Sequence, residues 1–360
     1  MKQTVPIGIT GLGCLSTLGH TPQAHLDALD SPPAPFRQLG SLTGVPGPLA
    51  DVFAAWIDPR SLLCHRKWSP ATCATLHVAR QAVAAAGWSA RDCDEAAIIF
   101  GTSRGTAAGW LEPWPDRRPF PIMAASNSLA SEPAAAVSHE LGIHGDWHVV
   151  SNGCCAGLDA LTTAAIWLRA GIVRKVLVLA CDLPLVRPVL DAYHSTGILA
   201  TPGKPGMIPA EGAAAICLES DAPPRAPRLV THASIAEPNA TLGSTSELPA
   251  LRKLLSRVLD AQGAPTLCIP HSSGTPMHAL SENQILDDLL SSDSVRLPLK
   301  HHTGHCIGAS GLLETVMACA ALKRGSPLQG TDLPAGSTIL KIASAMGGKH
   351  TVALIQSPHV

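Results

Sequence analysis

Short apolar runs rich in β-branched residues alternate with Ala- and Leu-rich stretches along most of this chain of 360 residues. A continuous apolar run bounded by turn residues is typical of a strand buried on both faces, whereas the longer Ala-rich stretches are typical of helices. The pattern therefore predicts an α/β fold with buried strands. The predicted strands are 6–10, 96–101, 147–151, 175–181, 213–220, 228–235, 265–271, 337–345 and 351–357. The predicted helices are 70–87, 132–142, 156–171, 247–263, 279–292 and 309–325, several of which end in Gly, a common helix stop.

The organisation of the chain indicates two related halves. Pro and charged residues cluster at 220–227, and each side of this segment contains a strand, a glycine-marked turn and a long Ala-rich helix. We therefore predict the halves to be 1–220 and 221–360. The Pro-rich segments 31–48 and 112–122 predict surface loops.

Composition excludes several classes of protein. A hydrophobic fraction of 46% with 15% charged residues excludes a disordered chain, and a net charge of −1 lacks the basic footprint of a nucleic-acid-binding protein. No stretch of about eighteen apolar residues free of charge occurs, which excludes a membrane-spanning helix.

The cysteines and the first residues of the chain give information on the cellular compartment of the protein. Eleven cysteines, scattered without paired spacing and partly inside apolar runs, indicate reduced thiols in a cytoplasmic protein. The segment 1–24 loosely resembles a signal peptide, but it is poor in Leu. The alternative for this segment is a first strand from Val5 to Thr10 that ends in a glycine turn.

One stretch places two cysteines at a predicted helix start. In "VVSNGCCAGLDAL", residues 149–161, Cys154 and Cys155 lie between a strand and a helix. Backbone N–H groups and the positive end of the helix dipole favour a thiolate at such a position and can hold an oxyanion. The alternative is a pair of small buried side chains beside a turn.

Two later stretches carry histidines. In "CIPHSSGTPMHALSENQIL", residues 268–286, His271 ends a strand and points to the edge where α/β folds bind ligands. "LPLKHHTGHCIGASGLLE", residues 297–314, clusters a lysine and three histidines before a helix. A zinc site of His301, His302, His305 and Cys306 is one interpretation, but structural zinc sites usually use separated ligand pairs.

The double cysteine also fits a second template. "GCCAG" matches G-x-C-x-G, the cysteine form of a nucleophile elbow, which would make Cys155 the nucleophile of a hydrolase. This interpretation leaves the two histidine stretches unexplained.

Together, the three stretches resemble the β-ketoacyl-acyl-carrier-protein synthases of the thiolase superfamily. Those enzymes carry a nucleophilic Cys, then "HGTGTP", then "K…GH…GAAG…E", and the same order occurs here. Further matches are "ITGLG" at 9–13, "GTSRG" at 101–105, "AEGAA" at 210–214 and "AMGGKH" at 345–350. The resemblance implies a five-layered α/β/α/β/α fold built of two similar halves, and no metal or other cofactor.

The resemblance implies that Cys154 is the nucleophile that takes the acyl chain. It implies that the backbone N–H groups of Cys154 and Met346 form the oxyanion hole. At the helix start, we expect the pKa of the Cys154 thiol to be lowered. Cys155, about 100° further around the helix, should face packed neighbours.

The resemblance implies that the two histidine stretches bind the malonyl thioester, which supplies the extender unit. His271 and His305 would bind the malonyl thioester and assist loss of its carboxylate. Lys300 would balance charge near His305, with Glu314 as its partner.

Departures from the family pattern concern substrate range rather than catalysis. Ser272 and Ser273 replace the usual Gly and Thr, and Met346 replaces the aromatic gate with a more flexible side chain. The chain is also short between "HSTGILA" and "MIPAEGA".

The predicted function is decarboxylative condensation of an acyl thioester with a malonyl thioester, both on acyl carrier protein, in fatty acid, polyene or polyketide biosynthesis. We expect a homodimer or a heterodimer with a related ketosynthase. Arg60, Arg66 and Lys67 precede a long helix and would face the acidic carrier protein; a solvated charge cluster is the alternative. Two other functions stay open: a chain-length-factor-type partner subunit, and a non-elongating thiolase-fold acyltransferase or hydrolase.

Overall fold

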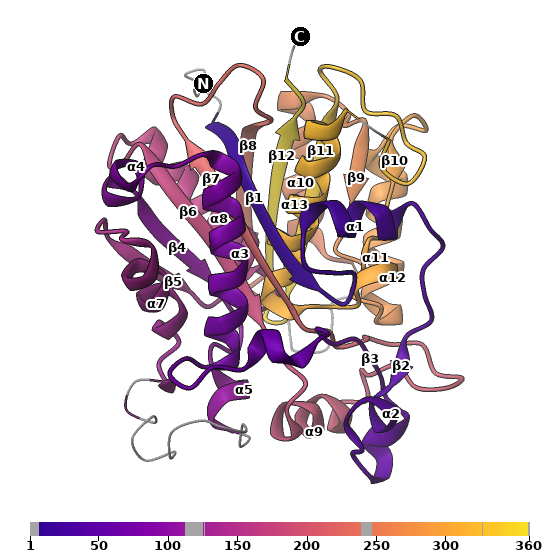
Figure 1. The fold of residues 1–360 in the computed structure, drawn as a ribbon. Coiled ribbons are helices and arrows are strands. Elements are labelled where there is room, and N and C mark those ends of the chain that lie inside the picture. Colours follow the sequence, from indigo (N-terminus) through magenta and orange to yellow (C-terminus); the bar gives the residue numbers. More distant parts are fainter. Residues whose placement is uncertain (1–6, 112–124, 126, 239–246, 326, 359–360) are drawn as a thin grey trace.

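The computed structural model describes residues 7–111, 125, 127–238, 247–325 and 327–358. Its strands form one large sheet of ten strands in the order β10-β9-β11-β12-β8-β1-β7-β6-β4-β5, and a small sheet of β2 and β3 (Figure 1). The large-sheet strands are β1 Ile7–Ser16, β4 Ala97–Gly101, β5 Trp147–Val150, β6 Lys175–Asp182, β7 Gly212–Glu219, β8 Arg228–Ala236, β9 Leu267–Ile269, β10 Val295–Arg296, β11 Thr338–Ala345 and β12 Lys349–Gln356. The small sheet pairs β2 Arg37–Gln38 with β3 Phe53–Ala54.

The helices cover and separate the strands. The α-helices are α1 Pro22–Leu29, α2 Leu39–Thr43, α3 Pro70–Ala86, α4 Ala90–Glu95, α5 Ala107–Trp110, α7 Glu132–Leu141, α8 Ala156–Arg169, α9 Arg187–Ser195, α10 Pro249–Gln262, α11 Pro276–Leu289, α12 Lys300–Thr303 and α13 Ser310–Arg324. Four 3₁₀ turns join them: η1 Gly47–Asp51, η2 Arg60–Leu63, η3 Gly153–Cys155 and η4 Ile307–Ala309.

The strand order of the large sheet repeats itself. Starting from β1, the order β1-β7-β6-β4-β5 has two antiparallel pairings followed by two parallel ones. Starting from β8, the order β8-β12-β11-β9-β10 has the same sequence of pairings. The two sets meet only where Ile7 and Gly8 pair with Leu229 and Arg228. The sheet is therefore two five-stranded sheets of identical topology that touch at one end.

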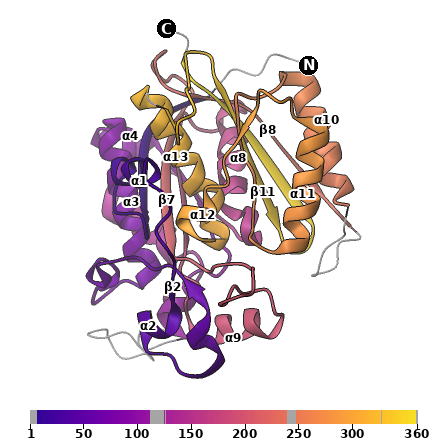
Figure 2. The ribbon, with the colours of Figure 1, turned by 90° about the vertical axis from the view of Figure 1, so that its right-hand side faces the viewer.

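Five layers result, and they are visible edge-on in Figure 2. α8 and α13 lie between the two five-stranded sheets, α3 and α7 cover the outer face of the first sheet, and α10 and α11 cover the outer face of the second. α13 is buried from Ser310 to Leu322, as a helix between two sheets must be. The predicted thiolase-like fold of two similar halves is confirmed. The boundary between residues 220 and 221 stays a prediction; β7 ends at Glu219 and β8 begins at Arg228.

Each predicted helix and strand is present, with ends shifted by a few residues. Local signals explain both ends of α3. Ser69 caps α3 by accepting the N–H of Thr72, Pro70 is the first helical residue, and Gly87 ends the helix in the left-handed region at φ 67°. The short helices and strands were not predicted, because each is too short to show a periodic pattern: α1, α2, α4, α5, α9, α12, β2, β3 and β10.

Two local predictions were wrong. The first strand does not end in a glycine turn, because β1 continues through Gly11 and Gly13 to Ser16. A Cβ on Gly11 would lie 2.0 Å from the carbonyl oxygen of Ala82 in α3, so these glycines let a helix pack directly on the strand backbone. Segment 31–48 is not only a loop, because it contains β2 and α2. The loop predicted at 112–122 lies outside the described residues.

No helix in the described ranges is long and apolar enough to cross a membrane.

Candidate active site

The candidate site lies where the amino-terminal ends of the two central helices meet. η3 precedes α8 in the first half, and η4 precedes α13 at the equivalent place in the second half. The two 3₁₀ turns contact each other, so residues 150 positions apart along the chain become neighbours. A cavity of about 500 Å³ opens here and is lined by Cys154, His271 and His305.

The three side chains converge inside this cavity. The sulfur of Cys154 and a ring nitrogen of each histidine lie within 4.8 Å of one another, and the two imidazole centroids are 5.2 Å apart. A thiol and two imidazoles at this spacing can act together on one small substrate group. A sulfur and two imidazoles are also zinc ligands, and this is the one such group of three among the residues that the structure describes.

The structure separates the two cysteines. Cys154 is partly exposed and lines the cavity, whereas Cys155 has no exposed surface and its sulfur donates to the carbonyl oxygen of Lys349 at 3.3 Å. The elbow template therefore selects the sulfur that does not line this cavity. Gly153 makes the turn into η3 at φ 58°.

The expected lowering of the Cys154 pKa is wrong. Burial raises the pKa of this thiol to about 11, against the opposing positive charges of Lys300 and Arg104 and a hydrogen bond from the backbone N–H of Met346. Cys154 lies in η3 rather than in the first turn of α8. The resting group is therefore a neutral thiol, and the Met346 N–H already points at the sulfur.

His305 is held in one tautomer. The backbone N–H of Ile307 donates to its Nδ1 at 3.1 Å, and the Ser310 hydroxyl lies 3.0 Å from the same nitrogen. Because Nδ1 accepts the N–H of Ile307, the ring proton is on Nε2. His305 therefore presents an N–H donor on its far side.

His271 is held by a buried carboxylate. Both oxygens of Glu282 accept backbone N–H groups, from His271 at 2.7 Å and from Ser272 at 2.8 Å. Ser272 has φ 43°, in the left-handed region that favours glycine. This is the position at which the family pattern has Gly, and the bond to Glu282 stabilises the conformation with a serine instead.

Both histidines are neutral. The pKa values of His271 and His305 are lowered well below the ordinary range, first by burial and then by the positive charge of Lys300. The site therefore offers neutral imidazole donors that strengthen when a negative charge develops on a bound oxygen.

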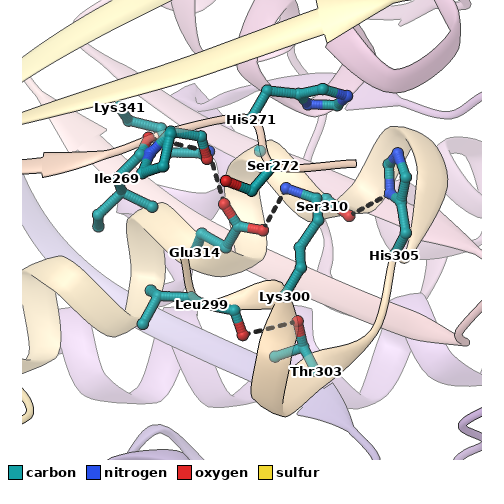
Figure 3. A network of polar contacts seen from close by, with 12 residues as sticks. Ile269, His271, Ser272, Leu299, Lys300, Thr303, His305, Ser310, Glu314 and Lys341 are labelled. Atoms are coloured by element: carbon teal, nitrogen blue, oxygen red, sulfur yellow. Dashed lines mark hydrogen bonds and ion pairs between the residues drawn. The ribbon is translucent and has the colours of Figure 1, made fainter. Parts of the chain in front are cut away.

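A buried ion network lies behind the two histidines (Figure 3). Lys300 donates to Glu314 Oε1 at 2.6 Å, and the ammonium of Lys341 lies 2.5 Å from Glu314 Oε2 as an ion pair. Lys341 also donates to the carbonyls of Ile269 and Pro270, the two residues before His271. Within this network two ammonium groups share the Glu314 carboxylate, while the Glu282 carboxylate holds the His271 loop nearby.

Lys341 was missed by the sequence predictions. Its only signal was a lysine in the middle of an apolar strand, where a side chain with no exposed surface must find partners. The structure supplies them and makes Lys341 a link between the His271 loop and Lys300.

Asp182 was also missed, although a carboxylate directly after a buried strand is a recognisable signal. It accepts the backbone N–H groups of Ser103, Arg104 and Gly308, each at 2.8 Å, and ties the two halves together. Burial raises the pKa of Asp182 to about 6 in spite of these bonds.

Met346 lies on the hairpin between β11 and β12. Gly347 and Gly348 follow it at φ 96° and 80°, and its side chain is 50% exposed at the edge of the cavity. A flexible side chain at this place can move without disturbing the hairpin backbone.

The proposed zinc set on 301–306 does not converge. His302 contacts Gln329, the sulfur of Cys306 donates to the Glu211 carbonyl, and of the four residues only His305 lines the cavity that holds Cys154.

The basic cluster before α3 divides into two parts. Arg60 forms a bidentate ion pair with buried Glu211 and lies over the Trp56 ring, so it belongs to the structural framework. Arg66 and Lys67 are exposed. That Arg60 faces a carrier protein stays a prediction, although its guanidinium is already paired with Glu211.

Comparison with protein families matches residues 47–223 to the model of the β-ketoacyl synthase N-terminal domain. The match includes Cys154 but ends before His271, so the placement of both histidines rests on the geometry above.

Individual relatives are distant. The chain is 28% identical over 215 residues to a putative polyketide β-ketoacyl synthase 1 of Streptomyces virginiae, covering 53% of this chain and 51% of that protein. It is 26% identical over 278 residues to nodulation protein E of Rhizobium meliloti, covering 69% and 68%. The chain thus spans about half the length of the Streptomyces protein.

Solved structures resemble the whole chain. A chain from a ketosynthase in complex with its chain length factor from Xenorhabdus doucetiae aligns with TM-score 0.80 and 17% identity, over 99% of both chains. A chain from a type II polyketide synthase acyl-carrier protein in complex with its ketosynthase aligns with TM-score 0.77 and 18% identity, over 99% of this chain and 100% of that one. These likenesses establish the fold.

Proposed function

We propose that this chain, whose residues 47–223 match the β-ketoacyl synthase N-terminal domain, is a β-ketoacyl-acyl-carrier-protein synthase that condenses an acyl thioester with a malonyl thioester. The observation that carries the proposal is the meeting of the Cys154 sulfur with the His271 and His305 rings, all within 4.8 Å, in one cavity. These groups come from both halves of the fold, and packing alone does not require them to meet.

In the first step Cys154 takes the acyl group. Its sulfur attacks the carbonyl carbon of the acyl thioester, the bond from that carbon to the carrier sulfur breaks, and the Cys154 proton passes to the departing carrier thiolate. The developing oxyanion is held by backbone N–H groups, for which the Met346 N–H beside the sulfur is well placed.

In the second step the malonyl thioester loses carbon dioxide. The bond between the carboxylate and the α-carbon breaks, and its electron pair forms an enolate whose oxygen is held by imidazole N–H groups of His271 and His305. The positive charge of Lys300 offsets the new negative charge. The enolate carbon then attacks the acyl carbonyl, and Cys154 leaves as thiolate and regains a proton.

The carrier protein is the proposed macromolecular partner. Arg66 and Lys67 are exposed just before α3 and offer positive charge to an acidic carrier surface. We also propose that the chain forms a dimer, either with a second copy of itself or with a related ketosynthase. The edge strand β5 has no partner on its outer side within the described sheet, and Trp147 of this strand is 38% exposed.

A cytoplasmic location is part of the proposal. All eleven cysteines lie in described residues, and each is a free thiol.

Two alternatives are less well supported. A chain-length-factor-type partner subunit would not need a nucleophile, yet Cys154 is present and faces the histidines. A hydrolase built on the elbow template would need Cys155, which is buried away from the cavity.

Incubation with acyl and malonyl carrier proteins, followed by intact mass measurement, tests the function. We expect an acyl adduct on the wild-type chain and none on Cys154→Ala. His271→Ala or His305→Ala should slow malonyl decarboxylation at least about a hundredfold while Cys154 still accepts the acyl group. The exposed His301→Ala is the matched control. Condensation at a near wild-type rate by His271→Ala or His305→Ala would contradict the assignment.

A further inference from the structure

The cavity holds a second pair of histidines besides the two near Cys154. His278 on α11 and His350 on β12 both line it, together with Ser344 of β11. The ring of His278 lies edge-on to that of His271, with centroids 5.1 Å apart. The four imidazoles therefore extend from Cys154 toward the α11 side of the cavity.

Three ring nitrogens of this second pair have no hydrogen-bond partner among the described residues. They are both nitrogens of His278 and Nε2 of His350. His278 Nδ1 is 3.9 Å from the nearest Glu282 oxygen, which is too far for a hydrogen bond. His350 is 2% exposed, and its Nδ1 is paired with the Ser344 hydroxyl at 2.8 Å. Buried polar atoms left unpaired are costly, so a ligand or water is expected at them.

The surroundings of His350 favour a neutral ligand. Burial lowers the pKa of His350 to about 4, and His278 lowers it further while Glu237 and Glu282 oppose the shift. His350 is therefore uncharged at neutral pH and cannot hold a carboxylate by ion pairing. An uncharged imidazole with a free N–H suits a carbonyl or hydroxyl oxygen.

The neighbouring side chains are apolar. Leu248, Met277 and Met346 line the same cavity, with Met277 52% exposed. An apolar wall with a few convergent polar atoms is typical of a site for a carbon chain that carries isolated oxygens.

We propose that His278 and His350 form a second hydrogen-bonding subsite, which binds a neutral carbonyl or hydroxyl oxygen of the thioester substrate. The proposal rests on the proposed function, because it takes the ligand of this cavity to be a thioester. The oxygen has two chemical sources: an oxo group on the acyl chain, as in a chain that keeps its keto groups, or the far amide of the pantetheine arm.

Equilibrium binding to the Cys154→Ala protein tests the subsite without any reaction. The probes are stable amides in which NH replaces the thioester sulfur: octanoyl and 3-oxooctanoyl on N-acetylcysteamine, and octanoyl on full pantetheine. We expect the 3-oxo ligand to bind about threefold to tenfold more tightly than the octanoyl ligand, the effect of one neutral hydrogen bond. If the arm supplies the oxygen, the pantetheine ligand shows this preference instead.

Phenylalanine variants should remove the preference. His278→Phe and His350→Phe keep ring size but lose the nitrogens, whereas His278→Gln and His350→Gln keep a donor and should retain part of the effect. His232→Phe is the matched control, because His232 also has a buried unpartnered Nε2 but does not line this cavity. Equal dissociation constants for all three ligands, or an equal loss in His232→Phe, would overturn the subsite. Failure of the proposed function would instead appear as absence of acylation and decarboxylation by the wild-type chain.

Discussion

Alkylation of Cys154 by iodoacetamide should depend on pH in a way that reports its buried environment. With a pKa of about 11, only about one Cys154 thiol in a thousand is ionised at about pH 8, whereas a thiol at the ordinary value of 9.0 is about one-tenth ionised. Since the thiolate is the reacting form, the rate at about pH 8 should be about a hundredfold below that of an ordinary accessible thiol. It should rise about tenfold per pH unit and flatten only near pH 11.

The neutral histidines are the reason for this expectation. A thiol beside an imidazolium ionises easily, but the pKa values of His271 and His305 are lowered, so no imidazolium is present at neutral pH. Among the groups that lower the pKa of Cys154, Lys300 has the largest effect. Lys300→Met should therefore raise the Cys154 pKa further and slow alkylation at every pH below the plateau.

The assay is timed labelling followed by peptide mass mapping. Because Cys64 is exposed and Cys73 is partly exposed, both would compete for reagent, so the experiment uses a background with both changed to serine. In that background Cys154 should be labelled ahead of Cys155. Cys155→Ala should keep both the labelling and acyl-enzyme formation, and Cys154→Ala should abolish them.

Two results would refute the reasoning. A rate already flat above about pH 7 would mean that a thiolate exists in the resting site, as in a thiolate–imidazolium pair. Preferential labelling of Cys155, with Cys154→Ala still active, would support the hydrolase interpretation instead.

Three further changes test other parts of the structure. Lys341→Met should lower the free energy of unfolding in urea by about 3–5 kcal/mol, because it breaks a buried ion pair. Since the Lys341 charge helps to lower the pKa of His271 and His305, its loss should also move the acid limb of the proposed decarboxylation rate to higher pH, which Lys341→Arg should largely prevent. The double variant Arg66→Glu, Lys67→Glu should raise the KM for carrier-bound substrate and weaken its salt dependence; an unchanged KM across salt would indicate a merely solvated cluster. Gly11→Ala should lower the free energy of unfolding by about 1–3 kcal/mol, because its Cβ would meet the Ala82 carbonyl at 2.0 Å. An unchanged urea midpoint would contradict the close packing.

Much of the fold could be predicted from sequence because its signals are local. Strands that are buried on both faces, such as β6 and β7, are apolar along their central residues, and α3 has its cap and its glycine stop directly at its two ends. The motifs around Cys154, His271 and His305 could likewise be found, because each is a short run that ends a strand or begins a helix.

Other features were decided by packing between distant segments. β1 runs through two glycines because α3 lies against it, and no local signal distinguishes that from a turn. Arg60 is bound to Glu211, which is 151 positions away, so its sequence neighbours could not show that it is already paired.

The pKa values and the contacts of the site residues also depend on packing between distant segments. The motif containing Cys154 determined which sulfur lies beside the helix, but the thiol pKa depends on how deeply the two halves bury it. Lys341 and His350 acquire their surroundings from packing: β11 places Lys341 against Glu314, and β12 places His350 in the cavity that Cys154 lines. Sequence determined the elements and the reactive residue types, since these depend on near neighbours along the chain. Tertiary structure decided charge state, partners and the shape of the cavity, since desolvation and Coulomb interactions depend on distance in space.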